Sequence, residues 1–163
     1  MATTVIESDV LIRGALVAES FTSPAQSVSA DAIKTSANVP ADKLESRIYS
    51  SHSQPNSAAT TETRPLFVAR RAGTVNSVLA GSIAKAIGDS TVTVDVKKNG
   101  TTILSAVITL DNANTARLGE AGTISDADFV ADDWFEVVIT ATAGSGTLPT
   151  GVFVQVESDQ DGV

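Results

Sequence analysis

One stretch of the chain, "STVTVDVKK" at residues 90–98, alternates strictly between valine and polar residues. Val92, Val94 and Val96 fall on one face of an extended chain and polar side chains fall on the other, which indicates a strand with one buried face. Asn99-Gly100 follows directly, and this pair supplies the positive φ angles of a tight hairpin turn. We therefore expect residues 103–110, "ILSAVITL", to return antiparallel, as a strand covered on both faces.

Further runs of strand type surround this hairpin, at residues 65–71, 74–80, 134–143 and 151–158. The last two form a second pair around the loop "GSGTLPT". Their inward-facing positions are Phe135, Val137 and Ile139 in the first run and Val152, Val154 and Val156 in the second. About six strands separated by turn signals predict an all-β fold, an antiparallel β-sandwich or jelly-roll-like head.

Composition agrees with a sheet protein, because 42% of the residues are hydrophobic but only 4% are aromatic. The core must then consist of Val, Ile, Leu and Ala, and β-branched residues favour strands. One alternative stays open beside the third run. Leu79, Ile83, Ala86 and Ile87 precede Gly88 at a spacing that also fits a short helix with a glycine stop.

The N-terminal part of the chain contains a near-repeat, in which "VSADAI" at residues 28–33 returns as "VPADKL" at residues 39–44. Its few apolar residues, Val28, Ile33, Val39 and Leu44, cannot close a core alone, so each repeat must pack on another copy or another surface. The end of this segment also predicts a short helix, with Pro40 in the first turn and Leu44 and Ile48 on one face. The alternative is an ordinary loop with one helical turn packed on the sandwich.

These observations predict three parts. Residues 1–50 form an extended arm that contains an extended run at 10–17 ("VLIRGALV"), the near-repeat and the short helix. Residues 51–63 are small, polar and aperiodic, which is typical of a linker or exposed loop. Residues 64–163 form the β-sandwich domain.

The net charge of −8 disfavours a nucleic-acid partner, because phosphate binding depends on Lys and Arg. No stretch approaches the roughly 20 apolar residues that cross a bilayer, so we expect a soluble protein without a membrane partner. The absence of cysteine excludes disulfides and thiolate sites. Glu7, Asp9 and Arg13 interrupt the apolar run that a signal peptide needs, so secretion by that route is not expected.

A search for reactive groups predicts no catalytic, cofactor or metal site. His52 is the one histidine and lies in the polar segment without a carboxylate close to it in sequence. Ser82 and Lys85 match S-x-x-K, but the partner motifs K-T-G and S-D-N are absent. Asn99-Gly-Thr101 has the form of a glycosylation site, yet the hairpin turn explains it more simply.

The acidic run "SDADFVADDWFEV" offers carboxylates that calcium could use, namely Asp126, Asp128, Asp132 and Asp133. An EF-hand requires glycine and glutamate where this chain has Ala131 and Val137, so that match fails. A calcium site of another kind stays open as an alternative. The simpler interpretation is a turn at Asp132-Asp133 before the Trp134 strand.

Arginines flank "PLFVA" at Arg64, Arg70 and Arg71 in an otherwise acidic chain. If Arg70 and Arg71 lie on a strand they point to opposite faces, so one of them can reach an acidic neighbouring chain. The alternative is an edge strand that is protected by charge against aggregation. The predicted interface set is therefore Val28, Ile33, Val39, Leu44, Ile48, Arg70 and Arg71.

The order of segments "LIRGALVAES", "SADAI…VPADKLE", a linker with His and Gln, "TETRPLFVARRAGTVNSV", "STVTVDVKKNGTTILSAVITL" and "EAGTISDADFVADDWFEVVITATAGSGTLPTGVFVQVE" resembles phage and prophage virion proteins. In these an N-terminal arm precedes a β-sandwich head. The chain looks like a capsid decoration (cement) protein of a tailed phage.

This resemblance implies a structural protein, not an enzyme, that is made in the host cytoplasm. It implies a homotrimer on the outer capsid surface, with the major capsid protein as partner and no cofactor. The alternative is a tail-fibre or appendage domain that binds a host receptor or carbohydrate. Sugar-binding surfaces present exposed aromatic rings, whereas Trp134, Tyr49 and the five phenylalanines mostly occupy core-like positions, which disfavours that alternative.

Overall fold

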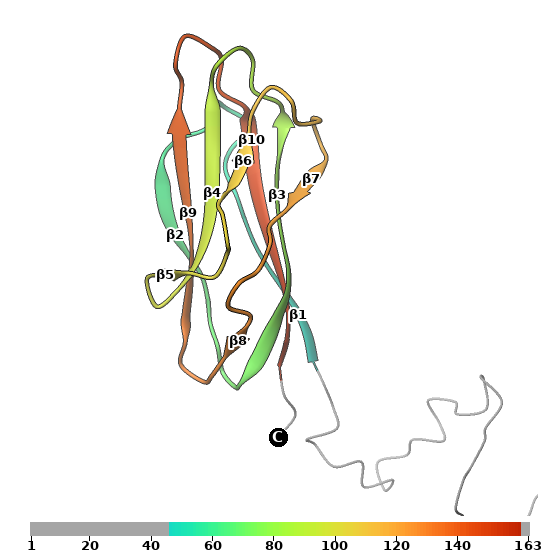
Figure 1. Ribbon diagram of the computed structural model, residues 1–163, viewed down its shortest axis with the longest axis vertical. Helices are drawn as coiled ribbons and strands as arrows, with labels where there is room; N and C mark the ends of the chain where they lie inside the picture. Colours follow the sequence, from blue (N-terminus) through green and yellow to red (C-terminus); the bar gives the residue numbers. More distant parts are fainter. Residues whose placement is uncertain (1–45, 161–163) are drawn as a thin grey trace, which may run out of the picture. The chain divides into compact units, whose positions relative to one another are not determined.

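The computed structural model describes residues 46–160, which contain strands and no helix. None of these residues therefore belongs to a helix long and apolar enough to cross a membrane. The strands, labelled in Figure 1, are β1 (Ser46–Ser53), β2 (Glu62–Val68), β3 (Gly73–Ala84), β4 (Thr91–Lys98), β5 (Thr101–Thr102), β6 (Ile108–Leu110), β7 (Gly119–Ala121), β8 (Asp128–Phe129), β9 (Trp134–Thr142) and β10 (Thr150–Gln160).

The strands form two antiparallel sheets, and successive strands alternate between them in the first half of the chain. One sheet has the order β1-β10-β3-β7 with β8 also paired to β3, and the other has the order β2-β9-β4-β5 with β6 also paired to β4. The pairing is nested: β1 pairs with β10, β2 with β9, β3 with β7 and β8, and β4 with β5 and β6. The described chain is therefore wound like one long hairpin across two layers (Figure 1).

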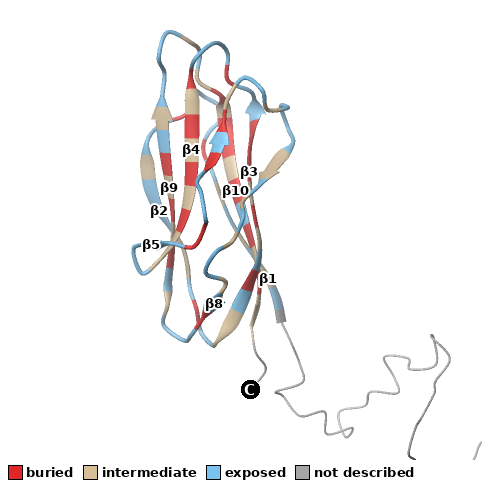
Figure 2. Ribbon diagram, viewed as in Figure 1, coloured by how far each residue is buried: buried red, intermediate tan, exposed pale blue. Residues whose placement is uncertain are grey.

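A single cluster of buried hydrophobic residues, most of them aliphatic, lies between the sheets and includes residues of both (Figure 2). The residues predicted to face inward on β4, β9 and β10 are all 0% exposed: Val92, Val94, Val96, Phe135, Val137, Ile139, Val152, Val154 and Val156. The predicted β-sandwich character is thus confirmed. At one end three aromatic rings complete the core, and the Phe67 and Phe135 rings stack with centroids 4.4 Å apart.

The predicted turn at Asn99-Gly100 is confirmed, with φ angles of 51° and 83°. The predicted return strand is shorter than expected, because within residues 101–110 only the short segments β5 and β6 pair with β4. Residues 105–107 are exposed, so the expectation of a strand covered on both faces is wrong there. The chain leaves β4 at this point because Leu104 bridges to Ile124 and the Ser105 N–H donates to the Thr123 carbonyl at 2.9 Å.

The structure excludes one alternative that the sequence left open, and it contradicts one predicted pairing. The alternative helix at residues 79–87 does not form, because the chain is a strand up to Ala84 and residues 79–84 pair with residues 150–155, the first half of β10. The runs around "GSGTLPT" do not pair with each other, because β9 lies between β2 and β4 while β10 lies between β1 and β3. That loop crosses from one sheet to the other.

The sandwich begins earlier than predicted. Residues 46–53 span the end of the predicted arm and the start of the predicted linker, but they form β1 and pair with β10 along their whole length. Ile48 therefore lies on a strand and not on the predicted helix. β2 likewise begins at Glu62, inside the predicted linker. Small polar residues are compatible with this strand because β1 is an edge strand, which pairs with β10 on one side only. The extended run at 10–17 and the near-repeat lie outside the described residues.

Candidate functional site

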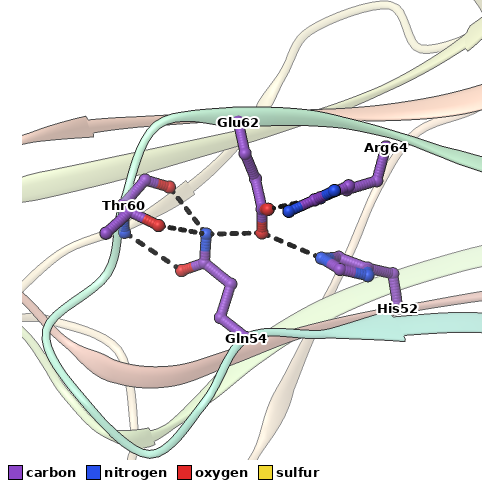
Figure 3. A network of polar contacts seen from close by, with 5 residues as sticks. All are labelled: His52, Gln54, Thr60, Glu62 and Arg64. Carbon is purple, nitrogen blue, oxygen red and sulfur yellow. Dashed lines mark hydrogen bonds and ion pairs between the residues drawn. The ribbon is translucent and has the colours of Figure 1, made fainter.

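The most connected polar group of the described chain lies where the edge strands of the two sheets approach each other. We call it the edge cluster: His52, Gln54, Thr60, Glu62 and Arg64 (Figure 3). His52 lies opposite Val154 and Glu62 opposite Ile139, and both of those partners are buried in the core. The cluster's side chains therefore face the open side of the sandwich between the layers.

Glu62 is the centre of the edge cluster. Its Oε1 lies 2.9 Å from His52 Nε2 and accepts from Gln54 Nε2 at 2.8 Å. Its Oε2 accepts from Arg64 Nε at 2.7 Å. The hydrogen bond with His52, followed by that with Arg64, lowers the pKa of the Glu62 carboxyl from 4.5 to about 2, against the opposing effect of burial. Glu62 is therefore a carboxylate at neutral pH and acts as an acceptor.

Gln54 ties the loop between β1 and β2 to the same group. Its Nε2 donates to the Thr60 carbonyl at 2.6 Å, and its Oε1 accepts from the Thr60 N–H at 3.2 Å. A histidine beside a carboxylate resembles part of a nucleophilic triad, but the described residues include no hydroxyl in hydrogen bond with His52. The arrangement fits closure of a sandwich edge by inward-pointing polar residues. The pair is not predictable from sequence spacing, because His52 and Glu62 lie on edge strands of different sheets and meet only in the folded chain.

The acidic run does not converge on one point. Asp126 pairs with Lys98 at 2.8 Å, and Asp128 accepts from Thr74 Oγ1 at 3.2 Å. Asp133 accepts from the Val130 N–H at 2.8 Å and from Asn99 Nδ2 at 2.7 Å, and these bonds lower its pKa, the Val130 N–H most strongly. Within residues 46–160 no three His, Asp or Glu side chains are grouped as metal ligands. The predicted turn is confirmed at Asp132, which has a φ of 71°.

The S-x-x-K residues are also separate. Ser82 is buried on β3, whereas the exposed Lys85 donates from Nζ to the Asn112 carbonyl at 2.9 Å. The pattern therefore brings no base to the serine hydroxyl.

The predicted interface residues fall in different places. Arg70 and Arg71 are exposed in the loop after β2, so the prediction that they project from a strand is wrong. The strand ends at Val68 because Ala69 turns inward and its N–H donates to the Asp133 carbonyl at 2.8 Å. Ile48 is half-buried on β1. The other members, Val28, Ile33, Val39 and Leu44, lie outside the described residues.

A second surface, at the other margin of β2, was missed. Trp134 is 43% exposed, and the residue opposite it on β2, Val68, is 46% exposed. Next to them is a hollow of about 350 Å³ lined by Val68, Ala69, Arg70 and Asp132. We call this the Trp134 surface. The exposure of Trp134 could have been predicted from the sequence, because strand alternation turns Trp134 outward if Phe135 faces the core.

No family model, no curated protein and no solved structure gives a significant match to this chain.

Proposed function

We propose that this chain is a virion structural protein, a capsid decoration (cement) protein of a tailed phage. In this proposal it binds the outer shell as a homotrimer and stabilises contacts between copies of the major capsid protein. It needs no catalytic group or cofactor, because its effect comes from burying surface between neighbouring subunits.

The observation that carries the proposal is the nested strand order. The orders β1-β10-β3-β7 and β2-β9-β4-β5 correspond to a double-sheet jelly roll, an architecture that viral capsid domains share with lectins and cupins. This is an argument by analogy of fold, since one fold can support several functions. It agrees with the virion resemblance of the sequence.

The structure shows where the predicted arm can be removed without cutting into a strand. Deleting residues 1–50 would remove most of β1, which pairs with β10. Deleting residues 1–45 leaves every described strand intact. If Val28, Ile33, Val39 and Leu44 lie between chains, this shorter deletion should leave a folded head that sediments as a monomer, because association must overcome several kcal/mol of lost freedom.

The proposal is tested by adding the purified full chain to phage shells prepared without it. We expect it to co-sediment with shells at a saturating ratio and to raise the temperature at which they break. The 1–45 deletion is the matched comparison. A folded, full-length protein that neither binds shells nor raises their stability would contradict the proposal.

A second candidate function is an appendage domain that binds a host receptor or carbohydrate. It is favoured by one observation: Trp134 and Tyr49 are not core residues but are exposed, at 43% and 58%. Exposed aromatic rings are what a sugar-binding face requires.

A further inference from the structure

We propose that the Trp134 surface is a binding site for a neutral saccharide. The proposed site does not depend on capsid binding, because all of its residues belong to the β-sandwich head.

The hollow has walls that are held in place before any ligand arrives. One wall is the end of β2 with Ala69, and the other is the turn that contains Asp132. Two backbone hydrogen bonds join these walls: the Asp132 N–H donates to the Ala69 carbonyl and the Ala69 N–H donates to the Asp133 carbonyl, both at 2.8 Å. A site whose parts are already fixed loses less conformational freedom when a ligand binds.

The hollow presents one charged donor and one charged acceptor that are free. Arg70 and Asp132 both line it. Within residues 46–160, neither of these side chains takes part in a hydrogen bond or ion pair, whereas Lys98 and Asp126 pair with each other at 2.8 Å. A guanidinium donates and a carboxylate accepts, so together they match a ligand whose groups do both. Sugar hydroxyls have that property.

An apolar platform adjoins the polar hollow. Val68 lines the hollow and also lies opposite Trp134, and cross-strand neighbours have Cβ atoms about 4.5–5.5 Å apart. Trp134 does not itself line the hollow, but it is the cross-strand neighbour of a residue that does. A sugar ring has one face of C–H groups that packs on an aromatic ring and a rim of hydroxyls that reach polar partners. The Trp134 surface offers both kinds of contact side by side.

Other ligand classes fit less well. The cavity of about 350 Å³ lies at the small end of the range of ligand pockets, about 300–1,000 Å³, so it holds about one sugar ring. The net charge of −8 repels anions, which disfavours acidic glycans and phosphates. Trp and Arg are also frequent in protein interfaces, so a protein contact at this surface is the main competing outcome.

The experiment uses the fluorescence of Trp134, which is the chain's one tryptophan and thus reports on this surface alone. The full-length protein is titrated with neutral oligosaccharides of glucose, mannose and N-acetylglucosamine. A sialylated saccharide is titrated in parallel as the anionic probe. We expect at least one neutral probe to shift the emission to shorter wavelength and to protect the indole from acrylamide.

Three variants keep the tryptophan and locate the binding. Arg70→Gln and Asp132→Asn should each weaken binding by about tenfold or more, as expected for a lost hydrogen bond to a charged group. Asparagine tolerates the positive φ at position 132, so that variant should still fold. Arg71→Gln is the matched control, because Arg71 is exposed in the same loop but does not line the hollow. It should bind as the parent does.

Each result decides the proposal. Protection of Trp134 by none of the neutral probes would overturn it, and so would protection by the anionic probe alone. Protection that appears only on phage shells would assign the surface to a protein interface. Loss of binding in Arg71→Gln equal to that in Arg70→Gln would show that general charge, and not the hollow, is responsible. Shell binding without saccharide binding would leave the decoration proposal standing while this one fails.

Discussion

The edge cluster and the Trp134 surface both lie along β2, and both combine charged and polar side chains, but they differ in how those groups are paired. In the edge cluster each charged group has a partner within the chain, and Glu62 alone has three. On the Trp134 surface Arg70 and Asp132 face a hollow. A polar network whose members are all paired therefore indicates structural closure, whereas unpaired donors and acceptors near an exposed ring indicate a binding partner.

Both regions depend on the same core, so the largest expected effect comes from breaking it. Val94→Asp places an unpaired charge where the side chain is 0% exposed and should unfold the head. Circular dichroism and thermal denaturation measure this. The control is Thr93→Asp, one residue along and on the outer face, which should keep the fold. Equal stability of the two variants would mean that the assigned strand face is wrong.

The next largest effect separates the two regions. Glu62→Gln removes the charged acceptor of the edge cluster and should lower the free energy of unfolding by about 1–2 kcal/mol. Saccharide binding at Trp134 should not change. Glu136→Gln on the outer face of β9 is the control and should alter stability little. If both glutamine variants are equally stable, the edge cluster does not hold the sheets together.

The Glu62 carboxyl also predicts how the stability of the fold depends on pH. Its pKa is about 2 in the folded chain and 4.5 ordinarily, so the unfolded chain binds more protons between these values. The contribution of the Glu62 carboxylate to the free energy of unfolding is fully present above about pH 4.5 and is lost as the pH falls toward 2. The difference in melting temperature between the parent and Glu62→Gln should become smaller as the pH falls from about 4.5 to about 2. A constant difference down to pH 2 would refute the assignment.

The smallest expected effect on stability belongs to the Trp134 surface. Trp134→Ala should cost less than about 1 kcal/mol, because the side chain is 43% exposed and its loss leaves no closed cavity. Phe135→Ala, its neighbour in sequence, should cost about 3–5 kcal/mol, because that ring is 0% exposed. Urea denaturation measures both. A large loss in Trp134→Ala would make the indole a structural residue.

Much of the local structure was predictable from short-range pattern. The alternation in β4 placed Val92, Val94 and Val96 inside, and Asn99-Gly100 marked the turn, because side-chain direction and positive φ are properties of a few adjacent residues. β1 was not predictable in this way. Its serines have weak strand preference, and they are extended because β10 pairs with them.

The sequence by itself determined the all-β class, the aliphatic core and the inward faces of β4, β9 and β10, because a period of two is written into consecutive residues. Only the tertiary structure decided that β9 and β10 lie in different sheets and that His52 meets Glu62. It also decided that Arg70 and Asp132 line one hollow beside Trp134. These depend on which distant strands pair, and pairing follows from the packing of the whole core.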